Sequence, residues 1–102
     1  MKRTLIGTFK FTPDIMMQKA GYHKHVSFKT KETSYIRRLG SLEYPHFHVY
    51  IDVVENSFQI NLHLDQKKPS YGEHTAHSGE YDGEFVEEEI GRVGRWFELF
   101  LL

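Results

Sequence analysis

The sequence predicts a single α+β domain in which a four-stranded, mainly antiparallel sheet packs against a C-terminal helix. Three observations lead to this prediction. Strict two-residue alternation over about 44–65 predicts a central hairpin, and alternation nearer the N-terminus predicts two further strands. Apolar residues at three- and four-residue spacing over about 83–100 predict an amphipathic helix. A chain of 102 residues can bury one hydrophobic core, and no linker or second domain is expected within residues 1–102.

The N-terminal part is expected to begin with a strand and a short helix. Residues 3–11 place apolar and polar side chains on alternate sides, which is typical of a strand. Thr12 is the expected N-cap and Pro13 the expected first residue of a helix over about 13–20. Proline suits that position because the first amide of a helix has no partner within the helix.

The next segment is expected to hold one further strand. Residues 22–30 alternate between the two sides of an extended chain and predict a strand. The pattern His23-Lys24-His25 within it is expected at a solvent-facing edge, and it could join a site on the hairpin if this strand flanks it. Residues 32–39 are expected to form one or two helical turns that Gly40 closes.

The hairpin has the clearest pattern in the chain. Apolar residues alternate with polar ones over 44–54 and again over 57–65. Residues 55–56 form a plausible two-residue turn, which places Val54 opposite Ser57. A slip of one residue would exchange the apolar and polar faces of one strand, so the alternation itself supports this register.

A stretch without periodicity separates the hairpin from the last helix. Residues 66–82 contain Pro69 and two glycines, and a segment of this length without regular structure is often functional. Asp82 is the expected N-cap of the helix over 83–100. Glutamates crowd the first turns of this helix, where they suit the positive end of the helix dipole.

Composition excludes several kinds of protein and of site. The chain has no cysteine, which excludes disulfides, thiolate metal sites and thiol nucleophiles. No apolar run approaches the roughly 20 residues of a membrane helix. No signal-peptide stretch follows Met1–Arg3, so the default expectation is a cytoplasmic protein. Seven histidines, by contrast, are many for a chain of this length.

The expected hairpin register gathers histidines on one face. It places His48 opposite His63 and His46 opposite Asp65, with Cβ atoms about 4.5–5.5 Å apart. Two imidazoles at positions i and i+2, with a third across the strand pair, can meet one metal ion. We therefore predict a divalent metal site for Zn, Mn, Ni or Fe. The core ligands would be His46, His48 and His63, with Asp65, His74 or His77 completing the shell.

A metal with an open coordination position would make a bound water more acidic, and a phosphate ester or another anion would be the expected substrate. Tyr71 and Tyr81 are candidate catalytic phenols, and Glu80 is a candidate general base if the loop closes over the site. Another interpretation needs no metal. The imidazoles, together with Lys67 and Lys68, could hold a phosphate or carboxylate.

The tripeptide His46-Phe47-His48 on a central strand resembles the metal motif of the HUH endonucleases, which include rolling-circle replication initiators and single-tyrosine transposases. The resemblance implies that His46 and His48 hold a divalent metal that polarises a phosphate of single-stranded DNA. It further implies that Tyr81 or Tyr71 is the nucleophile that forms a 5′-phosphotyrosine. The predicted last helix contains no tyrosine, which departs from the family pattern.

Charge and exposed apolar residues suggest possible partners. Residues 1–40 hold nine Lys and Arg and two Asp and Glu, whereas residues 41–102 hold four and twelve. Either the two halves attract each other, or the basic half binds nucleic acid or an acidic protein. The apolar end Trp96–Leu102 is a candidate homodimer interface. The basic residues that would contact an anionic partner are Lys10, Lys24, Lys29, Arg37 and Arg38.

Overall fold

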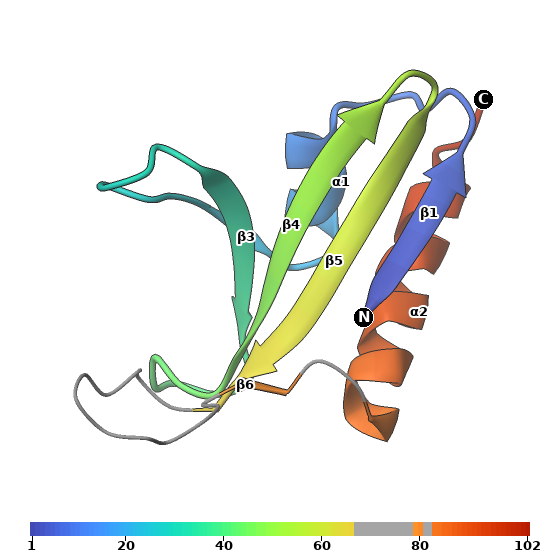
Figure 1. The fold of residues 1–102 in the computed structure, drawn as a ribbon. Helices are drawn as coiled ribbons and strands as arrows, with labels where there is room; N and C mark the ends of the chain where they lie inside the picture. The colour runs from blue at the N-terminus through green and yellow to red at the C-terminus, as the bar shows by residue number, and fades with distance from the viewer. Residues whose placement is uncertain (67–78, 81–82) are drawn as a thin grey trace.

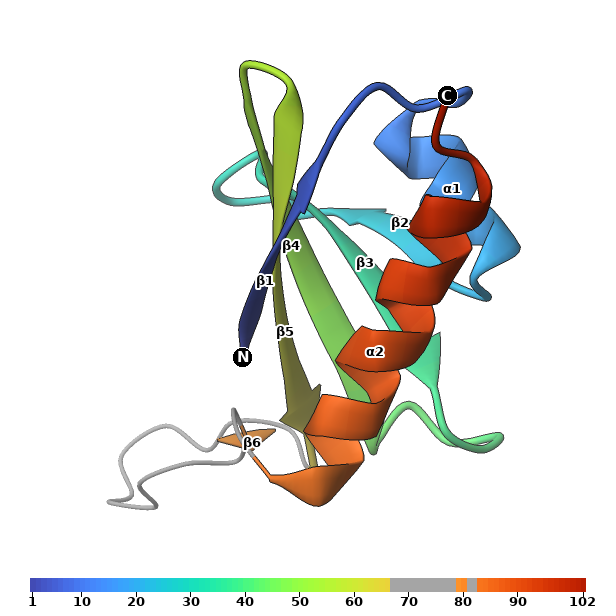
Figure 2. The same ribbon diagram turned by 90° about the vertical axis from the view of Figure 1, so that its right-hand side faces the viewer.

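The structure is a computed structural model that describes residues 1–66, 79–80 and 83–102. Its strands form one antiparallel sheet, and two helices cover one face of that sheet (Figures 1 and 2). The predicted α+β class is confirmed, but the sheet has six strands instead of four. Within the described residues, no helix has the length and apolar character needed to cross a bilayer.

The central hairpin pairs with β1 on one side and with β3 on the other. The strand order is β1-β5-β4-β3-β2, and the short β6 pairs with the end of β5. In chain order the elements are β1 (Lys2–Ile6), α1 (Pro13–Lys19), β2 (His23–Val26), β3 (Thr33–Arg38), β4 (His46–Val54), β5 (Ser57–Asp65), β6 (Gly79–Glu80) and α2 (Glu84–Leu99).

The hairpin register is confirmed along its whole length, from Val54 opposite Ser57 to His46 opposite Asp65. The apolar row of β4 therefore faces the helices, and Phe47 and Val49 are buried there. The core between sheet and helices is formed by Leu5, Met16, Met17, Ala20, Tyr22, Tyr35, Phe47, Val49, Ile60, Leu62, Leu64, Val86, Ile90, Val93 and Phe97.

The prediction of helical turns over 32–39 is wrong, because Thr33–Arg38 forms β3. This strand pairs with β2 on one side and with β4 on the other, so its backbone is satisfied by two ladders. Tyr35 packs into the core, and aromatic and β-branched residues suit a pleated surface better than a helix. Since β3 lies between them, β2 is the edge strand and does not flank the hairpin.

The predicted helices are confirmed, with small differences at their ends. Thr12 caps α1 and accepts a hydrogen bond from the amide of Ile15, as expected for an N-cap. The N-cap of α2 is Gly83 and not Asp82. The α2 helix then packs its apolar stripe onto the sheet, on the side opposite the hairpin histidines (Figure 2).

The first strand is shorter than the expected 3–11, because it ends at Ile6, just before Gly7. Gly7 has a φ of 131°, a conformation that only glycine adopts easily. A Cβ atom there would also lie 2.6 Å from Leu101 Cδ1. The chain then turns so that Phe9 forms an isolated bridge with Leu101, which joins the two ends of the chain.

A buried carboxylate links α2 to the segment that follows α1 and to β3. Glu89 accepts hydrogen bonds from Tyr22 at 2.6 Å and from Arg92 at 2.7 and 2.8 Å, and Arg37 approaches it at 3.5 Å. Arg92 also donates to the carbonyl of Ala20. Burial by itself would raise the pKa of Glu89, but the hydrogen bonds from Arg92 and Tyr22 and the nearby positive charges lower it overall.

We expect Gly7→Ala to lower the free energy of unfolding by about 1–3 kcal/mol, since the side chain strains the backbone and contacts Leu101. The matched control is Gly40→Ala, because a Cβ atom there meets nothing within 4 Å. That control should stay within about 0.5 kcal/mol of the wild type. Urea denaturation measures both, and equal stability of the two variants would contradict the role given to Gly7.

We expect Glu89→Gln to destabilise the fold at pH 7 by about 1–3 kcal/mol, because Arg92 and Tyr22 lose a charged acceptor. The lowered pKa means that ionised Glu89 stabilises the fold above its usual value of 4.5, and this contribution is lost as the pH falls below it. The difference between wild type and variant should therefore shrink between pH 7 and pH 3. Exposed Glu88 provides the control variant Glu88→Gln, for which denaturation curves should match the wild type at both pH values.

Candidate metal centre

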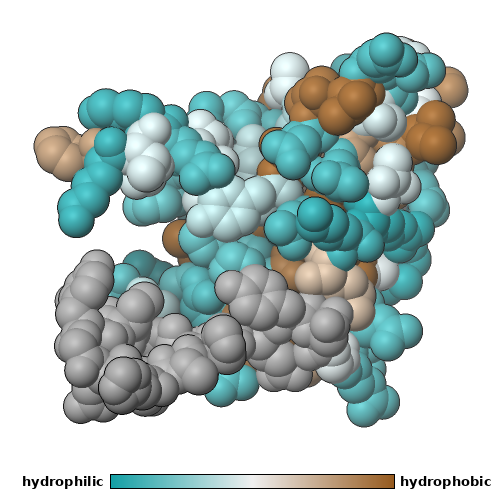
Figure 3. All heavy atoms as spheres, in the orientation of Figure 1, coloured by the Kyte–Doolittle hydropathy of each residue, from teal (hydrophilic) through white to brown (hydrophobic). Residues whose placement is uncertain are grey.

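The histidines of the hairpin lie on the sheet face that the helices leave uncovered. In the registers, His23, Ile36, His48 and His63 share one row across four strands. A neighbouring row contains Arg38, His46 and Asp65. Figure 3 looks onto this face, where hydrophilic side chains predominate. The uncovered face thus combines most of the potential ligands that the sequence predicts.

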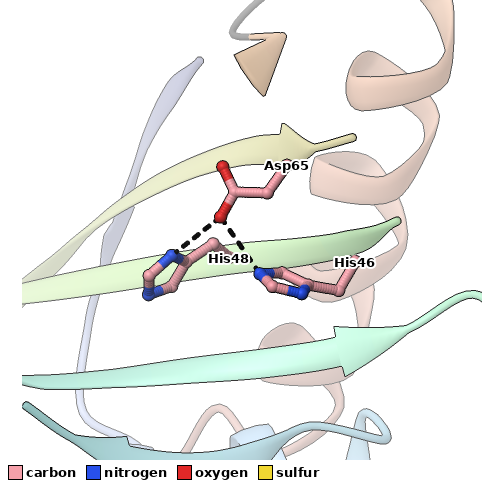
Figure 4. A group of neighbouring side chains, drawn as sticks. All are labelled: His46, His48 and Asp65. Carbon is pink, nitrogen blue, oxygen red and sulfur yellow. Dashed lines mark hydrogen bonds and ion pairs between the residues drawn. The ribbon is translucent and has the colours of Figure 1, made fainter. Parts of the chain in front are cut away.

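Three imidazoles meet at the carboxylate of Asp65. Its Oδ2 atom lies 3.0 Å from His46 Nε2 and 3.3 Å from His48 Nδ1, as the dashed lines in Figure 4 show. Its Oδ1 atom lies 3.1 Å from His63 Nε2. The side chain of Asp65 is 22% exposed, whereas that of His46 is only 6% exposed. Two strands therefore hold four ionisable groups in a largely buried cluster.

Contacts on the outer side of each ring fix the orientation of the two β4 histidines. His46 Nδ1 lies 2.8 Å from the carbonyl oxygen of Glu43. His48 Nε2 lies 2.8 Å from the hydroxyl of Ser34, which is itself buried. Tyr44 stacks on His46 with ring centroids 4.7 Å apart. Such contacts are the usual way in which proteins hold metal-binding imidazoles, with one nitrogen anchored and the other directed at the ion.

The contact with Glu43 determines where His46 carries its proton. A carbonyl oxygen only accepts hydrogen bonds, so Nδ1 of His46 must be the donor. In the neutral ring, Nε2 then has a lone pair, and this lone pair faces Asp65 Oδ2. Two electron-rich atoms at 3.0 Å repel unless a positive charge lies between them. That charge is either a second proton on His46 or a metal cation.

Asp65 is a competent anionic ligand at neutral pH. Burial by itself would raise the pKa of Asp65, but the hydrogen bonds from His48 and His63 and the charge on these rings lower it well below its usual range. The carboxylate is therefore ionised near pH 7. Two imidazole nitrogens and one carboxylate oxygen form a donor set that suits Zn and several first-row transition metals.

The spacing of the three donor atoms also suits one ion. His46, His48 and Asp65 offer ligand atoms that all lie within 4.8 Å of one another, so they could hold a metal ion. Bonds of about 2.1 Å at tetrahedral or octahedral angles separate neighbouring ligand atoms by about 3.0–3.4 Å. The two contacts of Asp65 Oδ2, at 3.0 and 3.3 Å, fall in this range.

The structure brings together some of the expected ligands and leaves others undescribed. His46, His48 and Asp65 form the group of three, while His63 contacts the second oxygen of Asp65. Glu80 is in β6, where it pairs with Leu64 in the ladder. The remaining expected residues lie outside the described part of the chain, namely His74, His77, Tyr71, Tyr81, Lys67 and Lys68.

Sequence reasoning missed two contributors to this site. Ser34 lies beside His48 only when its segment is a strand, whereas the sequence of residues 32–39 predicts helical turns. No sequence signal could indicate the carbonyl of Glu43, since every residue has a backbone carbonyl. The alternation of Ser34 with the core residue Tyr35 was the one signal that could have shown the hydroxyl on the histidine face.

The basic residues of the N-terminal half are distributed over both faces of the sheet. Arg37 lies on the helix side next to Glu89, whereas Arg38 belongs to the histidine face. Lys24 pairs with Asp14 at 2.9 Å. Binding of nucleic acid or an acidic protein through this half stays a prediction, as does a homodimer through the C-terminal end, where Leu102 is 74% exposed.

No known protein family, curated protein or solved structure matches this chain. The resemblance to HUH endonucleases thus rests on His46-Phe47-His48 alone. The tyrosines that it implies as nucleophiles, Tyr71 and Tyr81, are not among the described residues, and α2 contains no tyrosine.

We expect His46 to carry a proton on Nδ1 whether or not a metal is present, because the carbonyl of Glu43 accepts from this atom. Long-range ¹H–¹⁵N correlation spectra of the histidine side chains would measure this at pH 7. His25 is the internal reference, since it is exposed. An unprotonated Nδ1 in His46 would contradict the described contact.

Proposed function

We propose that this protein binds one divalent transition metal ion through His46, His48 and Asp65. The observation that carries the proposal is the contact between His46 Nε2 and Asp65 Oδ2 at 3.0 Å. With Nδ1 of His46 committed to Glu43, this contact is unfavourable for a neutral ring without a cation. A metal ion removes the repulsion and uses both lone pairs.

Three protein ligands leave at least one coordination position for water or substrate, which is the usual arrangement of a catalytic metal and not of a structural one. A metal held here would supply Lewis acidity and lower the pKa of a bound water. The contact of His63 with the second oxygen of Asp65 supports this proposal, because it holds the carboxylate in one orientation. Hydrolysis of a phosphate ester is the reaction class that we propose for such a centre.

We expect the protein to bind close to one equivalent of Zn²⁺ at pH 7.5, and His48→Ala and Asp65→Ala to abolish this binding, since each removes a donor of the group. Ser34→Ala removes only an outer contact of His48 and should weaken the affinity by about 10–100-fold. Isothermal titration and elemental analysis after chelator treatment measure both effects.

His25→Ala is the matched control, because His25 lies on the same face but two strands away from β4. It should bind Zn²⁺ as the wild type does. A folded wild-type protein that takes up neither Zn²⁺ nor Mn²⁺, Ni²⁺ or Fe²⁺ at pH 7.5 would contradict the proposal. His46 would then carry a second proton, and the cluster would be a hydrogen-bonded network only.

A further inference from the structure

A groove of about 370 Å³ lies towards the edge of the sheet, beside the group of candidate metal ligands His46, His48 and Asp65, which we call the metal group. The residues that line it come from the edge strand β2 and its neighbour β3, and they are His23, Lys24, His25, Ile36 and Arg38. Neither His23 nor His25 is a ligand of the proposed metal centre. The groove is large enough for the phosphate group and part of the alcohol of a small ester.

Arg38 lies between this groove and the metal group. It is the register partner of His46 on the adjacent strand, and both side chains belong to the same face of the sheet. Among the described residues, the side chain of Arg38 has no hydrogen-bond or ion-pair partner, in contrast to that of its neighbour Arg37, which pairs with Glu89. The groove therefore has an exposed guanidinium whose charge no described carboxylate neutralises.

His23 and His25 approach the groove from the edge strand. His23 pairs with Ile36 and His25 with Ser34, so both imidazoles belong to the face that carries the metal group. Each ring can donate a hydrogen bond from an N–H group. Together with the fork of Arg38, they offer donors from two strands. An arginine with further N–H donors beside it is a donor set that can bind a phosphate group.

We infer that this groove binds the phosphate group of a phosphate ester, with Arg38 as the main contact and His23 and His25 as further donors. Ile36 gives the groove an apolar side for the organic part of the ester. Adjacent strands are about 4.8 Å apart, so a phosphate bound by Arg38 of β3 lies about one strand spacing from the proposed metal ligands of β4. The inference deepens the proposed function, on which it rests, because it assigns the residues that bind the phosphate group of the substrate.

The test is a titration of the Zn²⁺-loaded protein with phenyl phosphate, in which ¹H–¹⁵N correlation spectra monitor binding. We expect shifts of amide signals in β2 and β3, Kd at least tenfold higher for Arg38→Ala, and Kd several-fold higher for His23→Ala. Arg37→Ala is the matched control, because it removes the same charge from the opposite face. Its Kd should stay within twofold of the wild type. Phenol should not bind, because it lacks the anion.

Wild-type affinity in Arg38→Ala would overturn the inference, and so would equal losses in Arg38→Ala and Arg37→Ala, which would indicate general charge attraction. A third outcome would also overturn the inference. If phenyl phosphate shifts amide signals of β4 and β5 only, and if only His48→Ala abolishes its binding, the anion binds to the metal alone. Zn²⁺ stoichiometry is measured on the same samples. If no metal binds while Arg38→Ala still weakens phenyl phosphate binding, the proposed metal centre fails and the groove stands.

Discussion

The pairing of β4 with β5 determines which side chains meet at Asp65. In this register His46 is opposite Asp65 and His48 is opposite His63, so two strands bring four ionisable groups within hydrogen-bond distance. A shift by one residue would move the histidines into the core and the apolar row into water. The burial of Phe47 therefore fixes the positions of the neighbouring His46 and His48. Folding energy and site geometry depend on the same alternation.

The insertion of β3 beside the hairpin gives the histidine face its remaining features. Ser34 bonds the outer nitrogen of His48, and Arg38 lies next to His46. Because β3 lies between β2 and β4, the histidines of β2 (His23 and His25) and those of β4 (His46 and His48) lie at different places on the same face of the sheet. A metal group with a cationic groove beside it is an arrangement that suits an anionic ester better than a neutral ligand.

One face of the sheet packs against the helices, and the other carries the hairpin histidines. On the covered face, α1 and α2 bury the core. Glu89 of α2 accepts from Tyr22, which follows α1, and from Arg92, which also donates to the carbonyl of Ala20 at the end of α1. The uncovered face can then hold unfavourable polar contacts near Asp65, because its residues are not needed for the main core. The buried ring of His46 has a partner for Nδ1 in the carbonyl of Glu43, whereas its Nε2 atom faces Asp65 Oδ2 and needs a cation between them.

Sequence alone determined the α+β class, both helices and the hairpin register, because alternation with period two and spacing of three to four residues are local signals. It also identified His46, His48 and Asp65 as neighbours. It failed for 32–39, where a short segment pairs with two strands and tertiary ladders decide its structure. Only the tertiary structure showed the carbonyl of Glu43 at His46 and the separation of Arg37 from Arg38. The first depends on the path of the chain just before β4, and the second on residues 33–38 being a strand, which their sequence pattern does not indicate.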